Sequence, residues 1–283
     1  MPIHDQGYRR YGGNKAQTGT GWTVIARAGI RTMVSKKAFL GLLLIAWLPF
    51  FVRAIQIYLA TAVAQAATLI PVTAETFRDF LDGFPQHVIV YFVTVYVGAG
   101  LIANDRRANA LQIYLSKPLT RAEYVFGKLA ILMTFLALVT WVPAIVLLLV
   151  QVAFSGSLKF LTANLYLFPA ITIYAFLEIT MVATTMLALS SLSKSSRYVA
   201  ILYSGILFFS AALYGAMFAI TGGSTSFAWL SLSANLTQVV DVIFRITPRY
   251  STPWQVSLIV IIGLIALSIS VLERRVRGVE VVT

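Results

Sequence analysis

Residues 127–152 read GKLAILMTFLALVTWVPAIVLLLVQV, a stretch of 26 residues whose one charge, Lys128, stands at its start. A helix rises about 1.5 Å per residue, so an apolar run of this length crosses a hydrocarbon core of about 30 Å. Lipid offers no partner to backbone N–H and C=O groups, and a closed barrel would show short alternating segments instead. The stretch therefore predicts a transmembrane helix in an all-α protein.

The rest of the chain repeats this signal. Hydrophobic residues make up 59% of the 283 positions and charged residues 11%, a balance outside the range of soluble globular domains. Spans are predicted near 38–60, 86–104, 127–152, 166–192, 198–220 and 255–272. The second is among the shortest, and Tyr91, Thr94, Tyr96 and Gly98 dilute its apolar character. The sequence thus predicts a polytopic membrane protein with six transmembrane helices.

Lysines and arginines gather on one predicted side of the membrane. Basic residues in short loops resist translocation and stay in the cytoplasm. Seventeen of the 22 fall on that side, namely Arg9, Arg10, Lys15, Arg27, Arg31, Lys36, Lys37, Arg106, Arg107, Lys117, Arg121, Lys128, Lys194, Arg197, Arg274, Arg275 and Arg277. This pattern predicts a multi-pass protein of a cell inner membrane with both termini cytoplasmic. No nucleic-acid partner is expected, because the charge is spread over loops and no soluble basic domain carries it.

The span boundaries divide the chain into a polar N-terminal tail at 1–20, a cytoplasmic helix at 21–37, a six-span domain at 38–272 and a C-terminal tail at 273–283. When residues 21–37 are projected onto a helix with 100° per residue, apolar and basic residues fall on opposite sides. This pattern predicts an amphipathic helix lying at the membrane interface. The apolar side holds Trp22, Ile25, Ala26, Gly29 and Met33, and the basic side holds Arg27 and Arg31. The two arginines are expected to meet either anionic headgroups or a partner protein.

Two loops on the opposite side also show helical periodicity. Amphipathic or re-entrant helices are predicted near 75–84 and 233–247. Their apolar positions are Phe77, Phe80, Leu81 and Phe84 in the first, and Leu236, Val239, Val240, Ile243 and Phe244, opposite Asp241 and Arg245, in the second. Such helices either cap an exit route for a substrate or rest at the interface.

No catalytic or metal site is predicted. The chain has no cysteine, and its two histidines are His4 in the tail and His87 at a span end, so haem and zinc sites with ligands at helical spacing are excluded. Gly127-Lys128 is followed by Leu129, so no nucleotide-binding P-loop is present. We expect a chain that is not an enzyme and holds no cofactor.

Two charged residues are expected inside the membrane, Arg53 in the first span and Glu178 in the fourth. Counted from the predicted cytoplasmic ends, both lie at about 21–22 Å along their helices. A lone ion in a bilayer interior is costly and favours pairing, so an Arg53–Glu178 ion pair is predicted. The alternatives are that Glu178 belongs to a substrate or proton path, or that it is protonated while Arg53 reaches outward.

The polar segment 105–128, between the second and third spans, carries a recognisable pattern. A small residue, an acidic residue, Leu, Pro, Ser or Thr, Arg and then Gly-Lys follow one another at Gly98, Asp105, Leu111, Pro118, Thr120, Arg121, Gly127 and Lys128. In this order they resemble the second span and first cytoplasmic loop of the ABC type-2, export-type permease family. Asp105 stands where Glu is usual in that family, and Asn109-Ala110 stands where Gly-Thr is commoner.

The resemblance implies that 105–128 is a coupling loop for an ATP-binding subunit. Leu111, Tyr114 and Leu115 are the expected anchors in a groove of that partner, Asp105 and Arg106 the expected polar contacts at the bundle end, and Pro118, Arg121 and Lys128 the further motif positions. Pro118 would end one helix, and Thr120 with Glu123 would start the next as a capping box.

The family resemblance also implies a function. One chain would be the permease subunit of an ABC transporter, paired with a second permease chain, the same or related. ATP and Mg would be held by a separate ATPase, and a hydrophobic or amphipathic substrate would be exported. The alternatives are an ATPase-independent secondary transporter and a membrane scaffold that transports nothing. The pattern specifies neither the substrate, nor the direction of movement, nor whether the two permease chains are identical.

Overall fold

The computed structural model describes residues 20–62, 71–110, 119–155 and 159–276, and this part of the chain contains helices and no strand. The helices are α1 (Gly21–Val34), α2 (Lys37–Ala46), α3 (Leu48–Ala62), α5 (Ala74–Asp82), α6 (Phe84–Val93), the π-helical η1 (Thr94–Gly98), α7 (Ala103–Arg107), α9 (Arg121–Val139), α10 (Trp141–Phe154), α11 (Lys159–Ala163), α12 (Leu167–Leu192), α13 (Ser196–Ile220), the 3-10 turn η2 (Ala228–Leu230), α14 (Leu232–Ile243) and α15 (Trp254–Arg275). The all-α prediction is confirmed for these residues.

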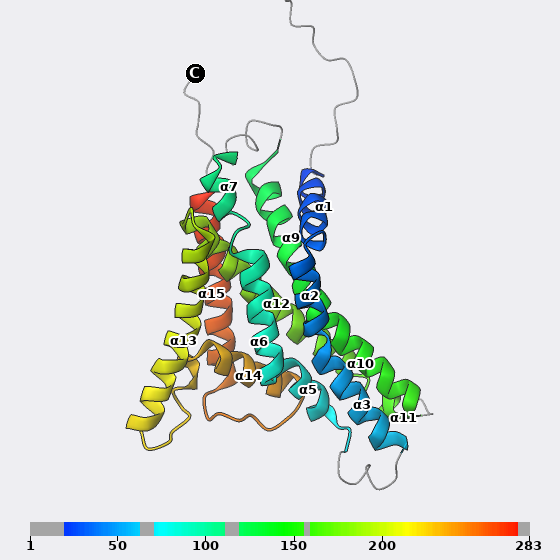
Figure 1. The fold of residues 1–283 in the computed structure, drawn as a ribbon. Coiled ribbons are helices and arrows are strands. Elements are labelled where there is room, and N and C mark those ends of the chain that lie inside the picture. Colours follow the sequence, from blue (N-terminus) through cyan, green and yellow to red (C-terminus); the bar gives the residue numbers. More distant parts are fainter. Residues whose placement is uncertain (1–19, 63–70, 111–118, 156–158, 277–283) are drawn as a thin grey trace, which may run out of the picture.

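Six helical segments are long and apolar enough to cross a membrane, as predicted. They are Lys37–Ala62, Ala74–Arg107, Arg121–Phe154, Leu167–Leu192, Ser196–Ile220 and Trp254–Arg275. Figure 1 shows that α7, the start of α9 and the end of α15 lie at one end of the bundle, and α5 and α14 at the other. We call these the Asp105 end and the Asp82 end, after a carboxylate at each.

The second segment is interrupted at Thr94–Gly98, among the residues that dilute its apolar sequence. After α6 the backbone widens into the π-helical η1 and then turns before α7. Gly98, the last residue of η1, lies so close to its neighbours that an added Cβ would come within 2.9 Å of Leu132 on α9. A small residue is therefore required for this segment to approach α9 closely.

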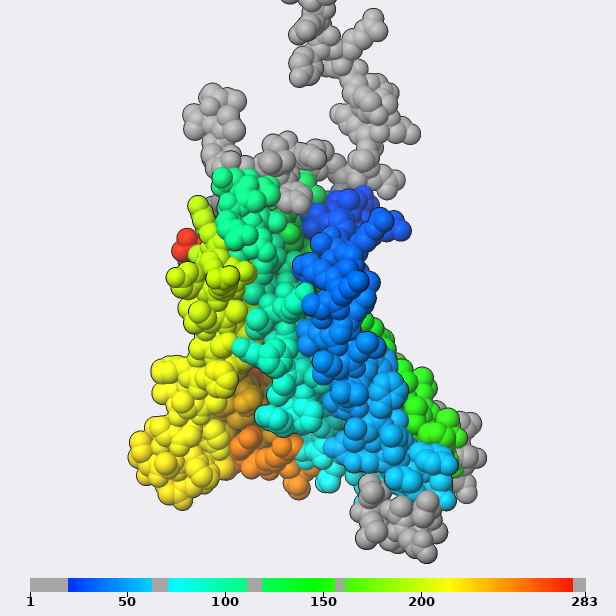
Figure 2. Space-filling view, viewed as in Figure 1, coloured from blue at the N-terminus to red at the C-terminus, as the bar shows by residue number. Residues whose placement is uncertain are grey.

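Helix α12 forms the centre of the bundle. It is buried along most of its length, and α9, α10, α13 and α15 pack around it. On the face shown in Figure 2, α13 lies on one side of α6 and α2–α3 on the other. Helix α13 buries only Val199 and Tyr203, so most of its surface is left for lipid or another chain.

Helix α1 packs lengthwise against α9, with Ile25 and Gly29 on the contacting side. At Gly127 on α9, an added Cβ would lie 2.8 Å from the Cβ of Ile25 and 3.0 Å from the carbonyl oxygen of Trp22. The side predicted to be apolar therefore serves helix packing, while Arg27 and Arg31 are exposed. That α1 lies on a membrane leaflet stays a prediction.

The two helices predicted on the far side are present as α5 and α14, and they contact each other at the Asp82 end. Phe77, Phe80 and Leu81 of α5 are buried as expected. Two details differ from the prediction. Phe84 is exposed because α5 ends at Asp82 and Phe84 begins α6. Asp241, which was placed opposite the apolar side of α14, is fully buried, because Arg78 of α5 and the backbone of Arg249 contact it.

Candidate functional site

At the Asp105 end, an ion pair closes the polar segment that links the second and third membrane segments. The Nζ atom of Lys128 lies 2.7 Å from Oδ2 of Asp105, and the Tyr124 hydroxyl donates a hydrogen bond of 2.7 Å to the same oxygen. Lys128 is only 8% exposed. Asp105 on α7 is thus fastened to two successive turns of α9, and we call these three residues the Asp105 clamp.

The other side of α7 is fastened to the end of α12. Ser190 accepts hydrogen bonds from the backbone N–H groups of Ile102 (3.1 Å) and Ala103 (3.0 Å), and donates one to the carbonyl of Ala99 (2.9 Å). Arg106 donates to the carbonyl oxygen of Ser191. A single serine therefore satisfies the backbone of the turn between η1 and α7, and α12 is tied to the same short helix as α9.

The predicted capping box at the start of α9 is present. The backbone N–H of Glu123 donates to Oγ1 of Thr120 (3.2 Å), and Oε2 of Glu123 accepts from the backbone N–H of Thr120 (2.8 Å). The other carboxylate oxygen of Glu123 accepts from the N–H of Gly21 (3.2 Å). The box therefore also ties the beginning of α1 to α9.

The structure places some of the predicted coupling residues and not others. Asp105, Arg106 and Lys128 make the contacts above, and Arg121 is exposed in the first turn of α9. The predicted anchors Leu111, Tyr114 and Leu115, and the helix-ending Pro118, lie outside the described residues. The coupling helix itself therefore stays a prediction.

At the opposite end, Asp82 is the centre of a buried polar cluster. Its carboxylate accepts from the hydroxyls of Thr237 (2.9 Å) on α14 and Tyr174 (3.3 Å) on α12. His87 Nε2 lies 3.6 Å from one of its oxygens and Arg249 Nη2 lies 3.7 Å from the other. Asp82 thus joins α5, α6, α12, α14 and the 244–253 segment.

A second carboxylate, Asp241, lies beside this cluster. Arg78 Nε is 3.3 Å from it, Arg249 Nε is 3.7 Å away, and the backbone N–H of Arg249 donates to it at 3.1 Å. Burial raises the pKa of Asp241 from 3.8 to about 6; Arg78 opposes this rise, and Asp79 and Glu75 add to it. In the described part of the chain, no three acidic or histidine side chains converge to hold a metal ion. The arginines beside the two carboxylates are Arg78 and Arg249.

Neither Ser190 nor the Asp82 cluster was predicted from the sequence. Arg78, Asp79 and Asp82 could have been noticed, because they are charged residues that alternate with Phe77, Phe80 and Leu81 in a short helix. Asp241 is likewise the one charged residue of the apolar α14. Charges among apolar residues indicate buried partners, but the pattern does not say which ones. Ser190 gave no comparable signal.

The predicted Arg53–Glu178 ion pair is wrong. Arg53 Nη1 donates to Oε1 of Gln56, one turn further along its own helix (3.1 Å), and lines a cavity of about 620 Å³ with Asp79, Asp82 and Arg249. Glu178 is 2% exposed, and its Oε2 has no hydrogen-bond partner among the described residues. Equal depth along two helices does not make them neighbours: α3 packs on α10 and α5, whereas Glu178 lies on the central α12.

Comparison with known proteins found no family model that matches this chain and no matching curated protein. Functional assignment therefore depends on the residues and contacts described above.

Replacing Asp105 by Asn should lower the free energy of unfolding by about 3 kcal/mol, because the nearly buried Lys128 would keep its charge without its carboxylate. Glu273→Gln is the matched control, since Glu273 is an exposed acid at the same end. Unfolding of the purified protein in detergent measures both. An equal loss in the two variants would show that the clamp contributes nothing specific, whereas adding Lys128→Met to Asp105→Asn should recover part of the loss.

Asp241 should make stability depend on pH. Its pKa is higher in the folded state than its ordinary value, so the folded state binds this proton more tightly; its contribution to stability is fully present below about pH 4 and is lost as the pH rises through 6. The stability of the unmodified chain relative to Asp241→Asn should therefore rise by about 1 kcal/mol between pH 7 and pH 5. Thermal unfolding at both pH values tests this, and a difference that is constant or falls on acidification contradicts it.

Proposed function

We propose that this chain is the transmembrane permease subunit of an ATP-binding-cassette transporter, which moves a hydrophobic or amphipathic substrate with ATP hydrolysed by a separate subunit. The observation that carries the proposal is the fastening of α7. Asp105 binds α9 through Lys128 and Tyr124, and Arg106 and the backbone of 102–103 bind the end of α12.

This arrangement suits the transmission of force. The segment 108–119 connects α7 to the capping box of α9, and the residues at both of its ends are bound to the bundle. A partner that grips Leu111, Tyr114 and Leu115 would push or pull on α7, and the clamp would pass the displacement to α9 and the central α12. A loop that served topology alone would not need a nearly buried ion pair at its base.

The second permease chain would approach through α13. Gly205 and Gly215 on this helix have open space around them, with no atom within 4 Å of an added Cβ. Small residues on an exposed helical face allow another helix to come close, which favours packing in membranes. In the proposed assembly ATP and Mg belong to the partner ATPase, and this chain is not an enzyme.

The basic residues favour a cell inner membrane with the Asp105 end in the cytoplasm. The described lysines and arginines of this end are Arg27, Arg31, Lys36, Lys37, Arg106, Arg107, Arg121, Lys128, Lys194, Arg197, Arg274 and Arg275. At the Asp82 end, Arg78 and Arg249 are balanced by Asp79, Asp82 and Asp241. This asymmetry is typical of a cytoplasmic face at the Asp105 end, and in the proposed orientation both termini are cytoplasmic.

One observation favours the ATPase-independent alternative. Glu178 is a buried carboxyl group on the central helix, with one oxygen free of hydrogen bonds from the described residues. Intramembrane carboxyl groups of secondary transporters carry protons or ions in this way. The presence or absence of an associated ATPase separates the two functions.

The first test is purification of the tagged chain from its native membrane in mild detergent, with mass spectrometry of the associated proteins and an ATPase assay. We expect a P-loop ATPase to co-purify, and to be lost, together with the ATPase activity, on Leu111→Asp with Tyr114→Asp. Ser226→Asp with Ser251→Asp adds the same charge to exposed positions away from the Asp105 end and should retain the ATPase. A chain that purifies without any ATPase contradicts the proposal and favours the secondary transporter or the scaffold.

Because the chain has no cysteine, single cysteines report its orientation directly. Lys194→Cys lies between the fourth and fifth segments at the Asp105 end, and Ser226→Cys lies in the connection that follows the fifth segment; both positions are exposed. A maleimide that cannot cross membranes should label Ser226→Cys in intact cells, and Lys194→Cys only after permeabilisation. The reverse labelling would place the Asp105 end outside.

A further inference from the structure

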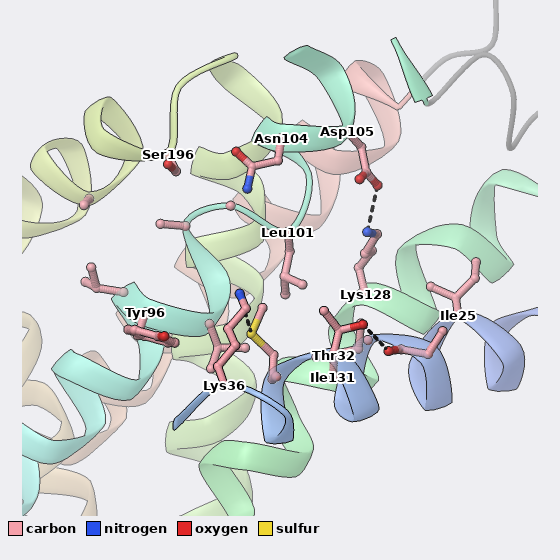
Figure 3. Close-up of a pocket in the computed structure, with 18 of the residues that line it drawn as sticks. Ile25, Thr32, Lys36, Tyr96, Leu101, Asn104, Asp105, Lys128, Ile131 and Ser196 are labelled. Atoms are coloured by element: carbon pink, nitrogen blue, oxygen red, sulfur yellow. Dashed lines mark hydrogen bonds and ion pairs between the residues drawn. The ribbon is translucent and has the colours of Figure 1, made fainter. Parts of the chain in front are cut away.

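A cavity of about 710 Å³ opens at the Asp105 end between α1, the second membrane segment, α9 and the start of α13. Its floor is formed by buried side chains, among them Val97, Leu101 and Ile131. Its rim is polar and exposed. Figure 3 shows Lys36 and Tyr96 on one side of the cavity and Asn104 and Ser196 across from them.

The charge at this cavity is positive. Lys128, at its inner edge, is neutralised by Asp105 at 2.7 Å. Lys36 and Arg197 are both exposed at the rim, and neither forms an ion pair with a described carboxylate. The ammonium of Lys36 lies 3.7 Å from Sδ of Met33 and 6.0 Å from the centre of the Tyr96 ring. Two cations from different segments therefore face one space, and the carboxylate that lines it, Asp105, is already paired with Lys128.

The cavity lies where the apolar segments begin. Lys36 directly precedes Lys37–Ala62, Arg197 is the second residue of Ser196–Ile220, and Asn104 is close to the end of Ala74–Arg107. This is the level at which phospholipid headgroups sit in a bilayer. The cations are thus at the depth of lipid phosphates.

Apolar side chains lie further along the membrane segments than the rim residues. Ile201 is one turn after Arg197 on the same face of α13. Leu40 lies in the first turn of α2, which begins directly after Lys36, and Phe92 lies near the end of α6, just before the η1 residue Tyr96. All three are exposed apolar side chains. An acyl chain attached to a headgroup in the cavity would lie along them.

We propose that this cavity binds the headgroup of an anionic phospholipid, with Lys36 and Arg197 contacting its phosphate, Asn104 and Ser196 donating hydrogen bonds, and an acyl chain following Leu40, Phe92 and Ile201. The bound lipid bridges α1, which packs on α9, to α13, which packs on α12 and α14. The site is independent of the proposed ATPase, because every group that forms it belongs to this chain.

The test is native mass spectrometry of the full-length chain, purified in detergent, stripped of lipid and titrated with phosphatidylglycerol or phosphatidylcholine. We expect phosphatidylglycerol to bind at least fivefold more tightly, and Lys36→Gln with Arg197→Gln to weaken its binding by roughly 10- to 30-fold, as expected for the loss of two cations near a lipid phosphate. Arg27→Gln with Lys194→Gln is the matched control. It removes one exposed cation from α1 and one three residues before Arg197, neither of which lines the cavity, and it should change binding less than twofold.

A third variant tests the cavity without changing charge. Ala28 is exposed and lines the cavity, so Ala28→Trp fills it from the rim and should lower phosphatidylglycerol binding as the double variant does. Equal affinity for the two lipids, equal loss in both charge variants, or unchanged binding by Ala28→Trp would each overturn the proposal. Displacement of phosphatidylglycerol by millimolar inorganic phosphate would show a site for free phosphate instead of a lipid. Unchanged elution from size exclusion and an unchanged unfolding temperature show that each variant is folded.

Discussion

A backbone inside hydrocarbon has no water to bond, and this constraint governs the rest of the structure. Long apolar segments must be helical, and any irregular turn needs another source of hydrogen bonds. The turn between η1 and α7 is such a place, and Ser190 supplies three bonds to it. At the interruption between α9 and α10, Gln86 of α6 similarly donates its side-chain amide to the carbonyl of Val139 at 2.9 Å. Some of the polar side chains inside the bundle therefore supply hydrogen bonds where the helices are interrupted.

The cost of placing charge in hydrocarbon also confines most charged residues to the two ends of the bundle, and their partners differ between the ends. At the Asp105 end, one nearly buried ion pair closes the base of a strongly basic loop. At the Asp82 end, buried carboxylates are held by arginines and hydroxyls from several helices, so α5 and α14 are bound to the rest of the bundle.

The proposed lipid site and the Asp105 clamp share an edge. Asp105 and Lys128 line the cavity and also fasten α7 to α9, so a lipid bound there would contact the residues that carry force in the proposed permease. Because Lys128 is already paired, it anchors the protein, while the rim cations Lys36 and Arg197 remain available for the ligand. At this cavity Lys128 is therefore a structural residue, and Lys36 and Arg197 are the residues proposed to bind the ligand.

The sequence by itself determined the properties that depend on local composition. The sequence predicted the six apolar segments, the helices α5 and α14, and the capping box of Thr120 and Glu123. These features depend on length, periodicity and short-range hydrogen bonds, which involve residues close together in the chain. Only the tertiary structure decided which polar groups meet. Arg53 and Glu178 have matching depths but lie on helices that are not neighbours, whereas Asp82 and Asp241, far apart in the chain, share Arg249. Pairing across helices depends on the rotation of each helix and the choice of its neighbours, which the packing of many side chains decides together.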